Sequence, residues 1–176
     1  GFLLLPRVKF GASDVSANGL HATNVNVAAG ATFRLPYSET DPFVLKGISL
    51  TGEGAFLGSY CLGEGSTFSS ATAANIEDLR LSTGSTLVFR RSDTLPLTAG
   101  EGLRLSGAIT VDVSDFASEQ RQPGYRYLMS IDSAKVAEGT SFVLKGLDPL
   151  FSKVVYDRSR GLLYVRTQNG SLLLVR

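Results

Sequence analysis

The residues of this sequence that could do chemistry are carboxylates close to basic side chains. Asp112 and Asp115 lie near each other, and Glu101 and Arg104 precede them. Carboxylate pairs cleave glycosidic bonds when they flank the bond from one face of a protein. Alternation over residues 109–113 places Asp112 on the polar side of a strand. A solvated strand face explains that position without catalysis, so we predict no catalytic residues and no enzyme activity.

Exposed aromatic side chains are a second group with a chemical use, because their flat rings can pack against sugars. Tyr37, Tyr125 and Tyr127 are the candidates. Tyr125 and Tyr127 stand two positions apart, so they share one face of a strand, and we predict that this face is in the core. The alternative function, a polysaccharide-active or glycan-binding protein, would use Tyr37, Asp112 and Asp115 as glycan contacts.

Other kinds of site lack their residue patterns. His21 is the single histidine and no metal-ligand spacing surrounds it. The sequence contains no Gly-x-Ser-x-Gly elbow for a nucleophile and no Gly-Lys-Ser/Thr ending for a phosphate loop. Cys61 is the single cysteine and is expected to be a small core residue. We therefore predict no metal and no cofactor.

The charge balance and the hydrophobic pattern exclude two classes of partner. The chain carries 17 Lys and Arg against 16 Asp and Glu, a net charge of +1. That balance creates no basic field for a polyanion, so nucleic acid is not an expected partner. No segment reaches the roughly 18 apolar residues of a membrane-spanning helix, so we expect no direct membrane span.

The elements that must position these residues are indicated by a repeated tetrapeptide, Gly-x-Ser/Thr-Phe/Leu. It begins at five glycines, of which the first four are spaced by about 18 residues: Gly30, Gly47, Gly65, Gly84 and Gly139. Apolar residues two apart on both sides of the glycine predict strand, turn and strand with one buried face. A period of about 18 is too short for a helical hairpin repeat. The pattern predicts an all-β, parallel β-solenoid with about 18 residues in each coil.

In such a stack the same position of each coil forms a column. The apolar residue after the hydroxyl residue would form one internal column: Phe33, Leu50, Phe68, Leu87 and Leu105. The hydroxyl residues would form an adjacent column or ladder: Thr32, Ser49, Thr67 and Thr86. The alternative fold is a β-sandwich, in which the period is accidental.

The end of the chain reads as an antiparallel meander. A turn ending at Gly161 separates two alternating runs, and Asn169-Gly170 is a strong hairpin signal. That register places four leucine and valine residues on one face: Leu163, Val165, Leu172 and Leu174. We predict that this meander caps the open end of the parallel stack, where unpaired strand edges would otherwise invite polymerisation.

We therefore predict a single domain over residues 1–176. It comprises an edge strand (1–10), regular coils (11–107), irregular coils (108–151) and the cap (152–176). The apolar strand Phe2-Leu3-Leu4-Leu5 could add to the open end of a neighbouring copy, a self-association contact. Because the sequence has no initiator methionine, we expect a processed form or a fragment of a longer protein.

Three motifs carry a resemblance to a known class of protein. They are the Gly-Ser-Thr-Leu strands, the Val-Asp-Val-Ser segment and the closing Tyr-Asp-x-x-x-Gly-x-Leu-Tyr-Val hairpin. Over roughly residues 11–176 the chain resembles large secreted bacterial surface proteins with autotransporter-associated β-strand repeats. The resemblance implies a right-handed parallel β-helix, export to the cell surface or beyond, and a structural or adhesive role. Neighbouring repeats or further copies would be its partners, and the class has no shared catalytic residues.

Overall fold

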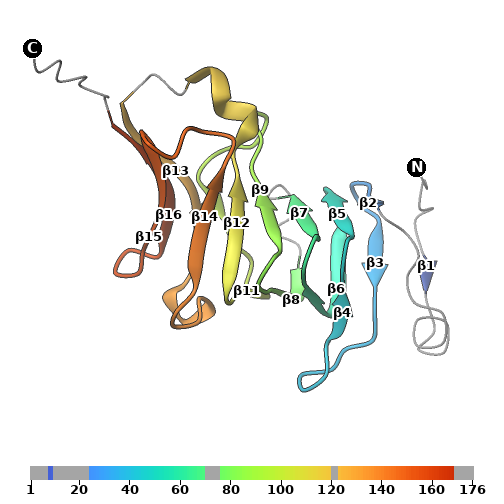
Figure 1. Cartoon of the computed structure of the whole chain (residues 1–176). Coiled ribbons are helices and arrows are strands. Elements are labelled where there is room, and N and C mark those ends of the chain that lie inside the picture. Colours follow the sequence, from blue (N-terminus) through green and yellow to red (C-terminus); the bar gives the residue numbers. More distant parts are fainter. Residues whose placement is uncertain (1–7, 10–23, 70–75, 120–122, 169–176) are drawn as a thin grey trace, which may run out of the picture.

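A computed structural model describes residues 8–9, 24–69, 76–119 and 123–168, which form three β-sheets (Figure 1). Sheet A contains β1 (Val8–Lys9), β3 (Thr32–Arg34), β6 (Ala55–Leu62), β8 (Ile76–Leu81) and β11 (Leu103–Leu105), and β4 (Phe43–Leu45) also pairs with β6. Sheet B contains β14 (Ser141–Lys145), β12 (Ala108–Asp112), β9 (Thr86–Val88), β7 (Thr67–Ser69), β5 (Ser49–Gly52) and β2 (Asn24–Val27). Sheet C contains β10 (Leu97–Thr98), β13 (Gly124–Ser130), β16 (Leu162–Thr167) and β15 (Ser152–Asp157).

The helices of the described residues are short 3-10 turns, η2 (Ser114–Glu119) and η3 (Ser133–Lys135). Neither is long or apolar enough to cross a membrane. The prediction of an all-β chain is therefore confirmed for the part of the chain that the structure describes.

Sheets A and B are built from parallel pairs only, as the repeat predicts. From β5 to β9 the chain alternates between the two sheets, with β5, β7 and β9 in sheet B and β6 and β8 in sheet A. Figure 1 shows the strands of sheet B following one another from β2 to β14. Parallel neighbours need a connection through other elements, and here the strands of the other sheet supply it.

The motif glycines occupy the turns that lead into the strands. All five have positive φ angles: Gly30 (77°), Gly47 (64°), Gly65 (73°), Gly84 (83°) and Gly139 (75°). A Cβ atom resists this conformation, so glycine recurs there. The predicted turn role of the repeated glycine is confirmed.

The internal column is confirmed in its middle and wrong at its ends. Leu50 pairs with Phe68, and Phe68 pairs with Leu87, all in sheet B and all fully buried. Phe33 instead lies in sheet A, opposite Phe56. The hydroxyl column follows the same division, because Ser49, Thr67 and Thr86 are in register in sheet B but Thr32 is in sheet A.

Leu105, at the other end of the predicted column, also lies in sheet A, opposite Leu81. The sheet B neighbour of Leu87 is Val111. The interval from Leu87 to Val111 exceeds the predicted 18 residues because this connection contains β10 of sheet C in addition to the sheet A strand β11. One period therefore does not describe all coils, since the loops between strands differ in length.

Buried apolar side chains form one continuous core between the sheets. Aromatic rings link neighbouring strands, with ring centroids 6.1 Å apart for Phe33 and Phe56 and 6.4 Å apart for Phe56 and Phe68. The core extends into sheet C through Leu163 and Val165. Each strand contributes few residues, so the core exists only once the strands are stacked.

Sheet C contains the first of the two hairpins predicted for the C-terminal meander. β15 and β16 form an antiparallel hairpin whose turn contains Gly161 with a φ of 61°. Leu163 and Val165 are buried on the same face, as predicted. β16 also pairs antiparallel with β13, which local sequence patterns do not indicate. Leu172, Leu174 and the Asn169-Gly170 turn lie outside the described residues.

Candidate functional site

The outer side of sheet C carries three tyrosines, here called the tyrosine face: Tyr125, Tyr127 and Tyr164. Because Leu163 and Val165 point into the core, alternation in β16 places Tyr164 on the opposite side. Tyr125 and Tyr127 are 59% and 42% exposed. Large exposed aromatic side chains that cluster on one side of a sheet are typical of a binding surface.

The three rings hold one another in place. The centroids of Tyr125 and Tyr164 are 5.7 Å apart at 64°, and those of Tyr127 and Tyr164 are 5.9 Å apart at 65°. These edge-to-face contacts are favourable, at about 0.5–1.5 kcal/mol for each pair. Tyr127 and Tyr164 are also direct partners across β13 and β16. The tyrosine face is therefore supported by the backbone of two paired strands.

The prediction that Tyr125 and Tyr127 face the core is wrong. The inward position between them belongs to Arg126, and the pairing of β13 with β16 shifts register after Tyr127. This bulge allows Leu128 and Met129, although adjacent in sequence, both to be buried. The tyrosines are left outside because the bulge changes which side of the strand supplies the core.

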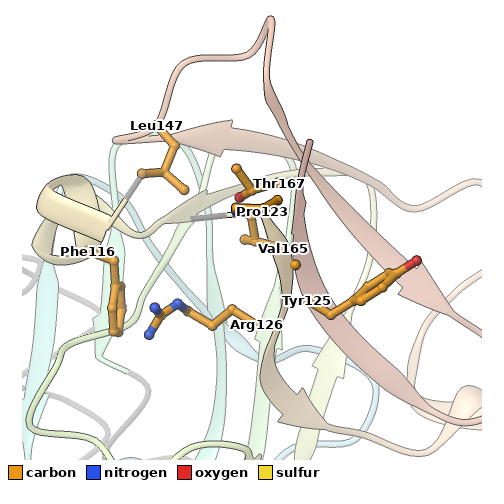
Figure 2. Close-up of a pocket in the computed structure, with 8 residues that line it drawn as sticks. Phe116, Pro123, Tyr125, Arg126, Leu147, Val165 and Thr167 are labelled. Atoms are coloured by element: carbon orange, nitrogen blue, oxygen red, sulfur yellow. The ribbon is translucent and has the colours of Figure 1, made fainter. Parts of the chain in front are cut away.

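Arg126 points the other way and lines a pocket of about 110 Å³ between η2 and sheet C. Figure 2 shows Arg126 and Tyr125 projecting from opposite sides of β13, with Arg126 directed at Phe116. The guanidinium carbon lies 4.5 Å from the centre of the Phe116 ring, a cation–π contact. Burial, with the nearby charge of Arg91, lowers the pKa of Arg126 from its ordinary value. The contact ties η2 to β13.

Charged residues stand at both ends of the tyrosine face. At one end the guanidinium of Arg166 lies 5.8 Å from the centre of the Tyr125 ring. At the other end Arg160 lies 3.8 Å from the Asp157 carboxylate. Hydrogen bonds from Ser159, led by its side chain, hold the pKa of Asp157 below its ordinary value, so this carboxylate is charged at neutral pH. An open hollow of about 330 Å³ lies over the tyrosines, bounded by Asp157 and Arg160.

The glycan contacts predicted from sequence are not brought together. Tyr37 is exposed on the loop after β3 and its hydroxyl donates to Glu39 at 3.3 Å. Asp112 lies at the end of β12 in sheet B, where its carboxylate accepts from Lys145 at 2.8 Å. Asp115 accepts from the backbone N–H of Arg91 at 2.8 Å.

Two residues next to these predictions also have structural partners. Glu101 lies 3.9 Å from Lys135, and Arg104 contacts the Asp78 carboxylate at 3.3 Å in sheet A. Asp78 is 4% exposed and is also held by Arg80 at 3.0 Å. The buried Asp78 carboxylate thus has its charge compensated by two guanidinium groups, and it is closed to a large substrate.

No group of three or more His, Cys, Asp or Glu side chains among the described residues is placed to hold a metal ion. Cys61 is partly buried in β6. His21 and the self-association strand Phe2-Leu3-Leu4-Leu5 lie outside the described residues. The self-association of that strand stays a prediction.

Sequence reasoning could have found the tyrosine face only in part. Tyr164 stands between Leu163 and Val165, so alternation alone indicates an outward ring. Tyr125 and Tyr127 join it through the pairing of β13 with β16, which has no short-range signal. Comparisons with protein families, with curated proteins and with solved structures found no match to this chain.

Proposed function

We propose that this chain is a non-catalytic adhesive module that binds carbohydrate through the tyrosine face. The observation that carries the proposal is the pair of ring contacts that joins three tyrosines on the outer side of sheet C, with Tyr125 and Tyr127 largely open to solvent. Sugar rings present apolar C–H faces that pack on such side chains. The tyrosines are held before a ligand arrives, so binding orders few side chains.

The carboxylates support a binding role over a catalytic one. Asp112 and Asp115 each accept hydrogen bonds that position a neighbouring strand or turn. No described carboxylate other than Asp157 lines the hollow over the tyrosines. Turnover of polygalacturonate or alginate by the purified chain would contradict the non-catalytic role.

We also infer that sheets A and B are two faces of one right-handed parallel β-solenoid. The alternation of consecutive strands between two parallel sheets and the shared core support this fold. In this arrangement sheet C would cap one end, and neighbouring coils or copies would stack at the other. The role fits a module of a secreted or cell-surface bacterial protein. An experimental structure in which the strands of the two sheets do not wind about one axis would overturn the fold proposal.

The binding proposal is tested with tyrosine variants in affinity electrophoresis and calorimetry against soluble polysaccharides. We expect Tyr164→Ala and Tyr127→Ala each to weaken binding about tenfold, which corresponds to about 1.4 kcal/mol. Tyr37→Ala is the matched control, because Tyr37 is similarly exposed but lies on a loop of sheet A. It should bind like the unmodified protein.

Two outcomes would overturn the proposal. One is an unmodified protein that binds none of the polysaccharides tested. The other is a loss of binding in Tyr37→Ala as large as in Tyr164→Ala. Tyr127→Ala guards against misfolding, because Tyr127 is 42% exposed and its removal leaves the core of sheet C intact.

A further inference from the structure

Two cations stand opposite each other beside the tyrosine face. Lys153 in β15 and Arg166 in β16 are direct cross-strand partners and lie on the outer side of sheet C. Like charges at such positions destabilise a sheet. Among the described residues, no carboxylate forms an ion pair with either of them. The sequence therefore keeps an unfavourable pair that an anion would relieve.

The pair lines a hollow of about 100 Å³ together with polar and apolar side chains. Gln168 also lines this hollow, and Leu150 and Phe151, 84% and 38% exposed, form an apolar wall. Arg166 belongs to this hollow and also lies over the ring of Tyr125, which lines the hollow of the tyrosine face. The two hollows are therefore neighbours joined by one cation–aromatic contact.

We propose that the tyrosine face and the Lys153–Arg166 pair form one binding surface for an anionic polysaccharide, with carboxylate or sulfate groups on some of its sugars. The tyrosines hold the sugar rings, while the pair binds the anionic substituent. The planar guanidinium of Arg166 suits two parallel hydrogen bonds to a carboxylate or sulfate, and Lys153 adds a point charge. This inference rests on the carbohydrate-binding function proposed above.

The charge pattern favours a polysaccharide over single-stranded nucleic acid, which also binds aromatic and basic surfaces. Nucleic acid carries a phosphate on every unit, but at the far end of the tyrosine row Arg160 is paired with the Asp157 carboxylate, so that end offers no uncompensated positive charge. The chain as a whole has a net charge of only +1. The surface therefore fits a ligand whose negative charge is spaced, with one substituent at the Lys153–Arg166 end.

The test compares polymers with the same backbone and different charge. Polygalacturonate is set against its methyl ester, and dextran sulfate against dextran, with the full chain in affinity electrophoresis and calorimetry. We expect the unmodified protein to bind the acidic member of at least one pair about tenfold more tightly, with a preference that falls as salt is added. Lys153→Gln and Arg166→Gln should lose that preference and keep the affinity for the neutral polymer.

Controls separate the two proposals. Tyr164→Ala should weaken the binding of both acidic and neutral polymers. Lys153→Gln and Arg166→Gln should weaken only the binding of acidic polymers. Lys46→Gln removes one positive charge from an exposed site next to β4, and it should leave the affinity for acidic and neutral polymers unchanged. Lys153→Arg keeps the charge and should retain the preference. Light scattering on each variant checks for aggregation, because β15 is an edge strand and an exposed lysine there protects the edge.

Four results would overturn the inference. Equal binding of acidic and neutral polymers would refute the anion site and leave the carbohydrate-binding function standing. If Lys46→Gln also lost the preference for acidic polymers, that preference would come from the overall charge of the protein and not from the Lys153–Arg166 pair. A single-stranded oligonucleotide that binds as tightly as polygalacturonate would show that the surface does not select sugars. Absence of binding to every polysaccharide would remove both proposals.

Discussion

At the scale of single residues, the hydroxyl of Tyr60 is a polar group in the core without a hydrogen bond to any described residue. Tyr60 is fully buried, with its ring 6.2 Å from that of Phe33. Burial raises the pKa of Tyr60 far above its ordinary value, so the phenol is neutral at every pH the fold would meet. An unsatisfied buried hydroxyl costs about 1–3 kcal/mol.

We predict that Tyr60→Phe raises the free energy of unfolding by about 1 kcal/mol, because it removes the unsatisfied group and keeps the ring. Urea denaturation measures the change. Tyr156→Phe is the matched control, since the Tyr156 hydroxyl donates to the carbonyl oxygen of Ile131 at 3.2 Å. The control should lose about 1 kcal/mol. A loss of stability in Tyr60→Phe would contradict the structure around the hydroxyl.

The Asp112 carboxylate makes stability depend on acid pH. Burial raises the pKa of Asp112, but hydrogen bonds from Lys145 and Ser114 outweigh burial, and the pKa lies below its ordinary value. A group with a lowered folded-state pKa stabilises the fold above its unfolded pKa, and the contribution is lost as the pH falls through the folded value. The relevant range is therefore below about pH 4.

We predict that Asp112→Asn makes the fall in unfolding free energy below about pH 4 shallower, because one proton-linked contribution is removed. Urea denaturation at several pH values measures the slope. Lys145→Gln, which removes the other partner of the ion pair, should also make the slope shallower. Parallel curves for Asp112→Asn and the unmodified protein would show that the ion pair with Lys145 does not contribute.

At the scale of elements, a bulge in β6 shapes sheet A. The pairing of β6 with β8 shifts register between Phe56 and Ser59, and Gly58 lies in that interval with a φ of 101°. Its N–H donates to the Glu77 carboxylate at 2.6 Å. A Cβ at this position would stand 2.0 Å from the carbonyl oxygen of Leu35. Glycine is therefore required here by both backbone conformation and space.

We predict that Gly58→Ala lowers the free energy of unfolding by about 3 kcal/mol, from backbone strain and the contact with Leu35. Gly139→Ala is the matched control, because Gly139 also has a positive φ but no atom within 4 Å of the place that an added methyl group would take. The control should cost about 1 kcal/mol from strain alone. Thermal and urea unfolding measure both, and equal losses would mean that β6 does not approach Leu35 as described.

At the scale of the whole molecule, stability comes from contacts between successive strands. Leu87 lies between Phe68 and Val111 in the middle of sheet B, and all three are fully buried. A strand of three residues such as β9 has no core of its own. Its burial depends on the neighbour on each side, so a defect at the centre of the stack weakens both halves.

We predict that Leu87→Ala lowers the free energy of unfolding by about 2–5 kcal/mol, the usual range for a fully buried leucine. Amide hydrogen exchange should show the loss of protection spreading to β7 and β12. Val143→Ala, at a position in β14 that is 54% exposed, should change stability by less than about 0.5 kcal/mol. Similar effects of the two variants would contradict the stacked core.

Local pattern was a reliable guide wherever the deciding contact is close in sequence. The repeated glycines all adopt the predicted positive φ, since a turn depends on its own residues. Leu163 and Val165 are buried as predicted, because alternation within β16 is enough to choose a face. The middle of the internal column, Leu50 to Leu87, is also in the predicted register, since the loops there have nearly constant length.

The candidate site depends on contacts that are distant in sequence. Tyr125 and Tyr127 were predicted to be buried, and a bulge between two strands more than thirty residues apart places them outside. Lys153 and Arg166 cannot be recognised as neighbours from the sequence, because only the pairing of β15 with β16 brings them together. Tyr37, Asp112 and Asp115 had suitable chemistry, but the fold gives them separate structural partners.

By itself the sequence determined the class of secondary structure, the turn positions and the buried face of most strands, because each depends on the period of nearby residues. Tertiary structure alone decided the strand neighbours at the ends of the predicted column and the pairing of β13 with β16, and therefore which side chains meet on the outer side of sheet C. Strand partners are chosen by packing and register over the whole chain, and a single bulge exchanges the exposed and buried sides. The tyrosine face and its basic pair exist only at that level.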